Sequence, residues 1–163
     1  MWLNDSLSRP DLQSLLNRLI EHVPVFSGFT QAELLELLNG AEKRLFEAGS
    51  RIISEGDTGN FMYVVINGEA RVLKQGDGFK KHELGNFGRG DCFGEMALVD
   101  RSPRSASIEA VTDCILIRIR EGDCWRNTVI SSKIFRNIAG ILAQRLREVH
   151  GLVLGKGSSG GKN

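Results

Sequence analysis

The sequence of 163 residues contains only three cysteines and three prolines, and it has no long hydrophobic run. Cys92, Cys114 and Cys124 are odd in number and lack metal-ligand spacing, so we expect reduced thiols and a cytoplasmic protein. No apolar run approaches the length of a membrane span, and residues 1–9 lack the hydrophobic core of a secretory signal. The formal net charge of +1 favours neither nucleic acid nor an anionic membrane as a partner. A disulfide scaffold, a membrane-spanning protein and a strongly basic nucleic-acid binder are therefore excluded.

The N-terminal 40 residues predict two amphipathic helices. Ser8 and Pro10 open the first, which is predicted to reach residue 22 because leucines recur at helical spacing from residue 12 to residue 19. A proline at position 24 ends it. Thr30 and Glu33 form a capping box for the second helix, over residues 31–38.

From residue 41 the pattern changes to short β-prone runs separated by glycine and Asn/Asp turns. The predicted strands cover residues 51–54, 62–66, 70–73, 81–84, 105–110 and 114–120. Many short strands at close spacing indicate a small sandwich or barrel. Two helices are predicted to follow, over residues 124–129 and from Ser131 to about His150, and residues 155–163 are predicted to be a flexible tail. The predicted fold class is α+β, mainly β.

The stretch from Phe93 to Ser107 carries the chemistry. Gly94 frees the backbone, and the apolar turn at residues 96–98 predicts a short helix whose first amides lack intrahelical partners. Such amides attract anions, and Arg104 adds a planar fork of donors that matches phosphate oxygens. A carboxylate at Glu95 belongs beside a phosphate only if a hydroxyl lies between them. The stretch therefore predicts a pocket for a small phosphosugar.

Residues 93–98, Phe-Gly-Glu-Met-Ala-Leu, followed by Pro-Arg-Ser-Ala-Ser at 103–107, closely resemble the phosphate-binding cassette of cyclic nucleotide-binding domains. That family includes regulatory subunits of cyclic-nucleotide-dependent kinases, cyclic-nucleotide-gated channels and bacterial catabolite activators. The resemblance covers roughly residues 23–154. It implies a double-stranded β-helix, or jelly-roll barrel, with N-terminal helices, a short cassette helix and two C-terminal helices. The implied domain spans residues 23–154, with a helical extension at 1–22 and the tail at 155–163.

The resemblance also implies the site. Glu95 would bind a ribose 2′-hydroxyl, Arg104 the cyclic phosphate, and the backbone amides of Ala97 and Ser105 the phosphate oxygens. The expected ligand-binding residues are Phe93, Gly94, Glu95, Met96, Ala97, Leu98, Arg104, Ser105 and Ala106. Apolar residues that either fill the core or border the base are Met62, Val64, Val72, Leu146 and Val149. Ser105 fits cAMP as well as cGMP, and we favour cAMP.

The predicted function is a regulatory module that binds a cyclic mononucleotide and shifts its C-terminal helices to act on an effector. An oxygenase on a related roll would need a His/Glu cluster for a metal, and none is visible, so we expect neither enzymatic activity nor a metal cofactor. A cyclic dinucleotide is an alternative ligand, although the Glu95 and Arg104 pair favours a mononucleotide. The sensor part of a transcription factor is another alternative, although no helix-turn-helix follows residue 154.

The predicted last helix has an apolar stripe at residues 135, 138, 142 and 149, near heptad spacing. Arg145 falls where an apolar seam residue is expected, and Gly140 weakens a long coiled coil. We therefore expect this helix to fold back as a lid, with Leu146 and Val149 near the base, and any homodimer through it to be weak.

Overall fold

The computed structural model describes residues 8–77 and 80–157, with side chains up to residue 151. Its helical elements are α1 (Arg9–His22), the 3-10 helix η1 (Pro24–Phe26), α2 (Gln31–Leu38), α3 (Met96–Asp100), α4 (Glu121–Cys124) and α5 (Thr128–Gly157). Its strands are β1 (Glu42–Phe46), β2 (Arg51–Ile53), β3 (Phe61–Asn67), β4 (Ala70–Gln75), β5 (Lys81–Phe87), β6 (Cys92–Phe93), β7 (Ser107–Ala110) and β8 (Cys114–Arg120).

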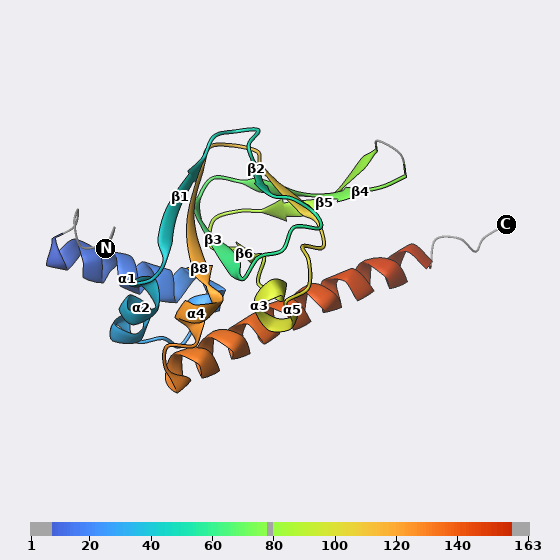
Figure 1. Ribbon diagram of the computed structural model, residues 1–163. Coiled ribbons are helices and arrows are strands. Elements are labelled where there is room, and N and C mark those ends of the chain that lie inside the picture. The colour runs from blue at the N-terminus through green and yellow to red at the C-terminus, as the bar shows by residue number, and fades with distance from the viewer. Residues whose placement is uncertain (1–7, 78–79, 158–163) are drawn as a thin grey trace.

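The strands form two antiparallel four-stranded sheets, with orders β1-β8-β3-β6 and β2-β7-β4-β5, that face each other as a roll (Figure 1). Strand β3 divides the apolar interior. Met62 and Val64 on one face join the core under the helices, whereas Tyr63 and Val65 on the other face join the core inside the roll. Because side chains alternate along a strand, a single buried strand supplies both cores. The fold is the predicted jelly-roll with helices at both ends of the chain.

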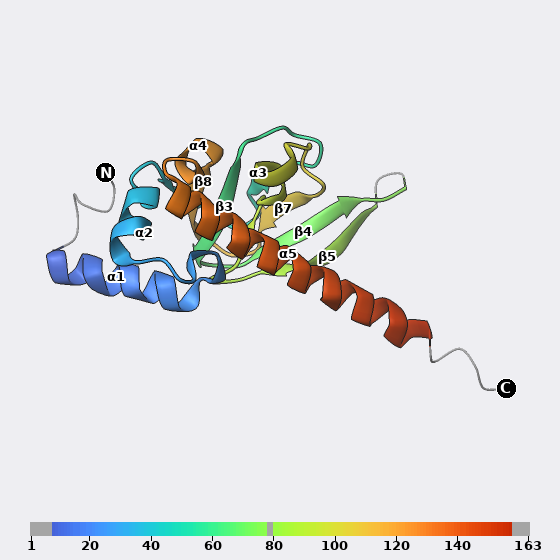
Figure 2. The same ribbon diagram turned by 90° about the horizontal axis from the view of Figure 1, so that it is seen from below.

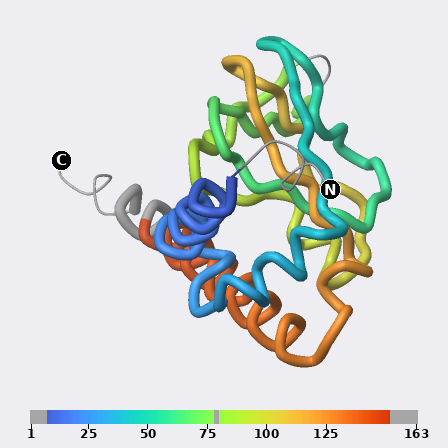
Figure 3. The backbone as a smooth tube through the Cα atoms, turned by 90° about the vertical axis from the view of Figure 1, so that its left-hand side faces the viewer, coloured from blue at the N-terminus to red at the C-terminus, as the bar shows by residue number. Residues whose placement is uncertain are grey.

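Helix α5 runs as one long diagonal beneath the roll and extends past it (Figure 1), with α1 and α2 on one side and α3 on the other (Figure 2). Its first half is tied to the N-terminal helices, which lie beside it in Figure 3. The Lys133 ammonium lies 2.6 Å from the Glu33 carboxylate, and the Asn137 amide donates to the carbonyls of Val25 and Ser27 at 3.0 and 2.8 Å. The start of α5 and the N-terminal helices therefore form one packed unit.

The sequence predicted the bounds of α2 and β8 correctly. Helix α2 has the predicted bounds, and its capping box is present, with Thr30 Oγ1 accepting from the Glu33 amide at 3.3 Å. Strand β8 also has its predicted bounds. Two strands were not predicted: β6 has only two residues, and β1 is a largely exposed edge strand with the charged sequence Glu-Lys-Arg-Leu-Phe.

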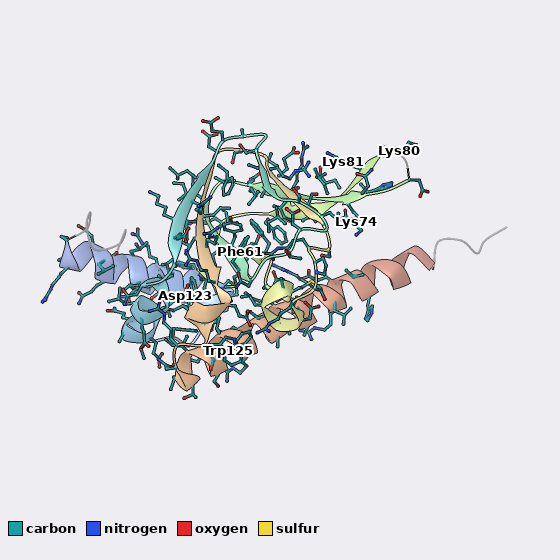
Figure 4. The ribbon with its side chains drawn as sticks, viewed as in Figure 1. Phe61, Lys74, Lys80, Lys81, Asp123 and Trp125 are labelled. Atoms are coloured by element: carbon teal, nitrogen blue, oxygen red, sulfur yellow. The ribbon has the colours of Figure 1, made fainter. Side chains whose placement is uncertain are left out.

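The C-terminal helices differ from the prediction. Helix α4 covers residues 121–124 rather than 124–129, and α5 begins at Thr128 and continues past Gly151 to residue 157, three residues into the predicted tail. Trp125 lies at the junction, beside the start of α5 (Figure 4), and its ring packs on Phe135 with centroids 4.7 Å apart. Residues 158–163 of the predicted tail lie outside the described residues. None of the described helices is both long and apolar enough to cross a membrane.

Candidate ligand-binding site

A cavity of about 180 Å³ opens between the cassette stretch, the roll and α5. The stretch supplies most of its wall, through Phe93, Gly94, Glu95, Met96, Ala97, Asp100, Ser102, Pro103, Arg104, Ser105 and Ala106. The remaining wall comes from Ile53, Val72, Phe87 and Ile108 of the roll and from Arg145 of α5. The cavity therefore has a polar side at the cassette and an apolar side at the roll.

The backbone around Arg104 fixes this residue at the cavity. Its amide donates to the Asp57 carbonyl at 2.8 Å, and its carbonyl accepts from the Gly56 amide at 2.8 Å. Gly94 faces it with φ +77°, a conformation that favours glycine, and a Cβ on Gly94 would lie 2.7 Å from Arg104 Nη1. The glycine is therefore required both by its backbone angle and by the close approach of the guanidinium.

The Arg104 guanidinium is buried, with 6% of the residue exposed. Nη1 donates to the Gly94 carbonyl and Nη2 to the Phe61 carbonyl, both at 2.6 Å, and the group lies 4.7 Å from the centre of the Phe61 ring. Burial lowers its pKa, while Tyr63, Glu95 and Asp57 oppose that shift, and a guanidinium stays protonated in proteins. Two of its five N–H donors are used, which leaves a fixed positive charge with donors to spare at the cavity.

Glu95 is the second buried charged group of the cavity, with 2% of the residue exposed. Burial raises the pKa of its carboxyl group, and the positive charges of Arg145 and Arg104 oppose that shift. Its Oε1 accepts from Arg145 Nη1 at 2.6 Å, and Arg145 Nη2 donates to the Cys92 carbonyl at 2.6 Å. Arg145, which lies 50 positions further along the chain, thus pairs with the carboxylate of Glu95 at the start of α3.

The structure brings most of the predicted site residues together. Phe93 to Ala97, Arg104, Ser105, Ala106 and Val72 all line the cavity. Leu98 lies next to them in sequence, but its side chain is buried in the core under the helices.

The other candidates for the base lie away from the cavity. Met62 and Val64 are fully buried in the helix-side core, on the face of β3 opposite to Tyr63 and the roll interior. Leu146 and Val149 of α5 are 56% and 55% exposed and do not line it.

The sequence did not assign seven residues of the wall to the site: Ile53, Phe87, Asp100, Ser102, Pro103, Ile108 and Arg145. Of these, Arg145 and Phe87 lie outside the cassette stretch and contact each other. The sequence does hint at a role for Arg145, because this charged residue interrupts the apolar stripe of the last helix. It gives no such hint for Phe87, which lies beyond the end of the strand predicted at residues 81–84. Among the described residues, no group of His, Cys, Asp and Glu could hold a metal ion.

The sequence matches the family described as "Cyclic nucleotide-binding domain" over residues 43–126, which is more than half of the chain. The chain belongs to the cyclic nucleotide-binding domain family. The matched segment begins within β1, ends just after α4 and includes the whole cassette stretch. The family resemblance seen in the sequence is thereby confirmed.

Two relatives and one solved structure illustrate the similarity. The chain is 34% identical to the "Cyclic AMP receptor protein" of Thermus thermophilus over 125 residues, 77% of this chain and 58% of that protein. It is 29% identical to the "cAMP-dependent protein kinase regulatory subunit" of Mycosarcoma maydis over 85% of this chain and 26% of that protein. The crystal structure of the Thermus thermophilus Catabolite Activator Protein superposes with a TM-score of 0.72 at 33% identity, covering 80% of this chain and 61% of that one. The chain therefore spans between about a quarter and three fifths of the length of these relatives.

Proposed function

We propose that this cyclic nucleotide-binding domain is a cAMP receptor module whose ligand repositions α5. The observation that carries the proposal is the presence of two buried, oppositely charged groups in one cavity, Arg104 and Glu95. An arginine with unused donors suits a cyclic phosphate, and a buried carboxylate suits a hydroxyl donor on the adjoining sugar. The names of two relatives, a cyclic AMP receptor protein and a cAMP-dependent protein kinase regulatory subunit, favour adenine over guanine.

In the proposed complex the phosphate lies between Arg104 and the first amides of α3. The remaining guanidinium N–H groups donate to phosphate oxygens, and the amides of Ala97 and Ser105 supply further donors. The ribose 2′-hydroxyl donates to the Glu95 carboxylate, whose Oε1 accepts from Arg145 in this structure. A cyclic dinucleotide with a 2′,5′ linkage lacks a free 2′-hydroxyl at the linked position, so the presence of Glu95 beside Arg104 in the cavity favours a mononucleotide.

The proposed movement follows from how α5 is held. Its first half is tied to α2 and η1 through Lys133 and Asn137, whereas Arg145 ties its second half to the cavity. A ligand hydroxyl that replaces Arg145 on Glu95 would release the second half and leave the first half attached. The ligand would then bind the two helix positions with different affinity, which is what a population shift requires.

Calorimetric titration of the purified chain with cAMP, cGMP and a cyclic dinucleotide tests the ligand. We expect cAMP to bind more tightly than cGMP and the dinucleotide to bind weakly. Spin labels on α3 and near residue 150 would report whether their distance changes with cAMP but not with 5′-AMP, which lacks the cyclic phosphate. Tighter binding of the dinucleotide would contradict the ligand assignment, and an unchanged distance would contradict the helix movement.

A narrower candidate is the sensor part of a transcription regulator, because the chain covers 58% of the Thermus thermophilus receptor protein at 34% identity. Exposed Leu146 and Val149 on the second half of α5 would then contribute to a weak homodimer. Light scattering over a concentration series, with and without cAMP, distinguishes a dimer from a monomer that acts on another effector. The chain's three cysteines are buried and unpaired, which fits the proposed cytoplasmic location.

A further inference from the structure

Phe87 is an aromatic residue at the apolar side of the cavity, at the end of β5. Phe93 stacks on its ring, with centroids 5.2 Å apart and an interplanar angle of 25°. The guanidinium carbon of Arg145 lies over the same ring, 5.0 Å from its centre. The Phe87 ring is therefore supported by one aromatic neighbour and covered by a planar cation, an arrangement in which the cation is held by the ring electrons.

The Arg145 guanidinium makes two contacts that belong to different parts of the cavity. One terminal nitrogen donates to Glu95 at 2.6 Å, and the planar group covers Phe87. Glu95 and the ring are thus within reach of one small planar group. In a ribonucleoside, the 2′-hydroxyl and the base are carried by adjacent sugar carbons, so a ligand with its hydroxyl on Glu95 has its base directed to the same neighbourhood.

We propose that Phe87 is the stacking platform for the base, and that the base takes the ring face that Arg145 covers in this structure. The inference rests on the proposed function, because it assumes a cyclic nucleotide in the cavity. Phosphate and sugar contacts are the same for every cyclic nucleotide, so discrimination between bases must come from the apolar side. An aromatic platform favours a large, flat purine, since stacking of a base on an aromatic side chain changes affinity by roughly tenfold to a hundredfold.

The proposal also explains why an arginine suits this position on α5. A guanidinium is planar and stacks on aromatic faces while it pairs with a carboxylate, which an ammonium does poorly. Arg145 therefore satisfies both the buried charge of Glu95 and the exposed face of Phe87 when no nucleotide is bound. Entry of a nucleotide exchanges one planar group for another, and the exchange couples base recognition to release of α5.

The test compares cAMP with ribose 3′,5′-cyclic phosphate that carries a methoxy group in place of the base. Affinities for both are measured on the parent chain and on Phe87→Leu, with Phe46→Leu as the matched control. Phe46 is a partly buried aromatic in the same roll core that packs on Tyr63 and does not line the cavity. Circular dichroism and thermal unfolding verify that each variant is folded.

We expect the parent and Phe46→Leu to prefer cAMP by at least about tenfold, and Phe87→Leu to lose most of that preference while its affinity for the base-free ligand stays within about twofold. In Phe87→Trp, the added indole should retain the preference, and its fluorescence should respond to cAMP but not to the base-free ligand.

Two results are informative in opposite ways. An unchanged preference in Phe87→Leu, together with an indole that does not respond to cAMP, would overturn the assignment of Phe87 and leave the proposed function standing. A parent that binds neither ligand would overturn the proposed function itself, and the assignment with it.

Discussion

Replacing Arg104 with alanine would remove a buried cation that holds two carbonyls as well as the proposed phosphate. The carbonyls of Gly94 and Phe61 would each lose a donor at 2.6 Å. Hydrogen bonds to charged groups contribute roughly 1.5–3 kcal/mol each, so the folded state would lose about 3 kcal/mol at the lower end. For a domain of this size that corresponds to a decrease in Tm of roughly 6–12 °C. The variant should remain folded at room temperature, because total stabilities are about 5–15 kcal/mol.

Arg104→Ala should lose much of its affinity for cAMP even though most of the protein stays folded. Removing one partner of a buried charged contact costs about 2–5 kcal/mol of binding free energy. At about 1.4 kcal/mol per factor of ten, this is a roughly 30-fold to 4,000-fold increase in Kd. Arg104→Lys keeps the charge but lacks the planar fork, so we expect it to recover only part of the affinity.

The assay is calorimetric titration well below the Tm of each variant, with urea unfolding to correct for any unfolded protein. Arg101→Asn is the matched control, because Arg101 is an exposed cation of the same stretch that pairs with Glu121 at 2.8 Å. Its φ of 54° is a conformation that asparagine tolerates. Affinity of Arg104→Ala within twofold of the parent, or an equal loss in Arg101→Asn, would refute the assignment of Arg104 to the phosphate.

Further predictions concern Glu95 and α5. Glu95→Gln should weaken cAMP binding by roughly tenfold or more but leave binding of 2′-deoxy-cAMP nearly unchanged; equal losses would show that Glu95 does not bind the sugar. Burial raises the pKa of Glu95 above its ordinary 4.5, so the parent should be most stable relative to Glu95→Gln below about pH 4.5 and lose that advantage as pH rises through the raised pKa. Urea unfolding from pH 4 to 8 tests this sign. Lys133→Met removes the ion pair between Lys133 and Glu33 and should loosen the first half of α5. Hydrogen exchange of the amides in that half should then be faster than in Arg147→Met, a control variant at an exposed position of the same helix.

The sequence by itself determined the features whose causes are local. The capping box at Thr30 and Glu33 fixes the start of α2 within one turn, and the alternation in residues 114–120 fixes β8. The cassette is contiguous, so the order of residues along the chain is enough to assign Gly94, Glu95 and Arg104 to one loop. Family membership followed from the same contiguous residues.

Tertiary structure decided which apolar face of β3 meets which core. Both faces of that strand are apolar, so nothing in the strand itself places Met62 and Val64 under the helices rather than beside the cavity. Strand β1 is similar, since its exposed, charged sequence is held as a strand by pairing with β8, which lies far along the chain.

The contents of the cavity wall opposite the cassette were also decided only by the tertiary structure. Arg145 reaches Glu95 across 50 positions, and its guanidinium covers a ring at position 87. No local sequence pattern predicts these contacts of Arg145, because they depend on where the 30-residue helix α5 lies after it packs on α2 and η1. The chain carries the chemistry of the cassette in consecutive residues, whereas the group that competes for Glu95 is brought there by long-range packing.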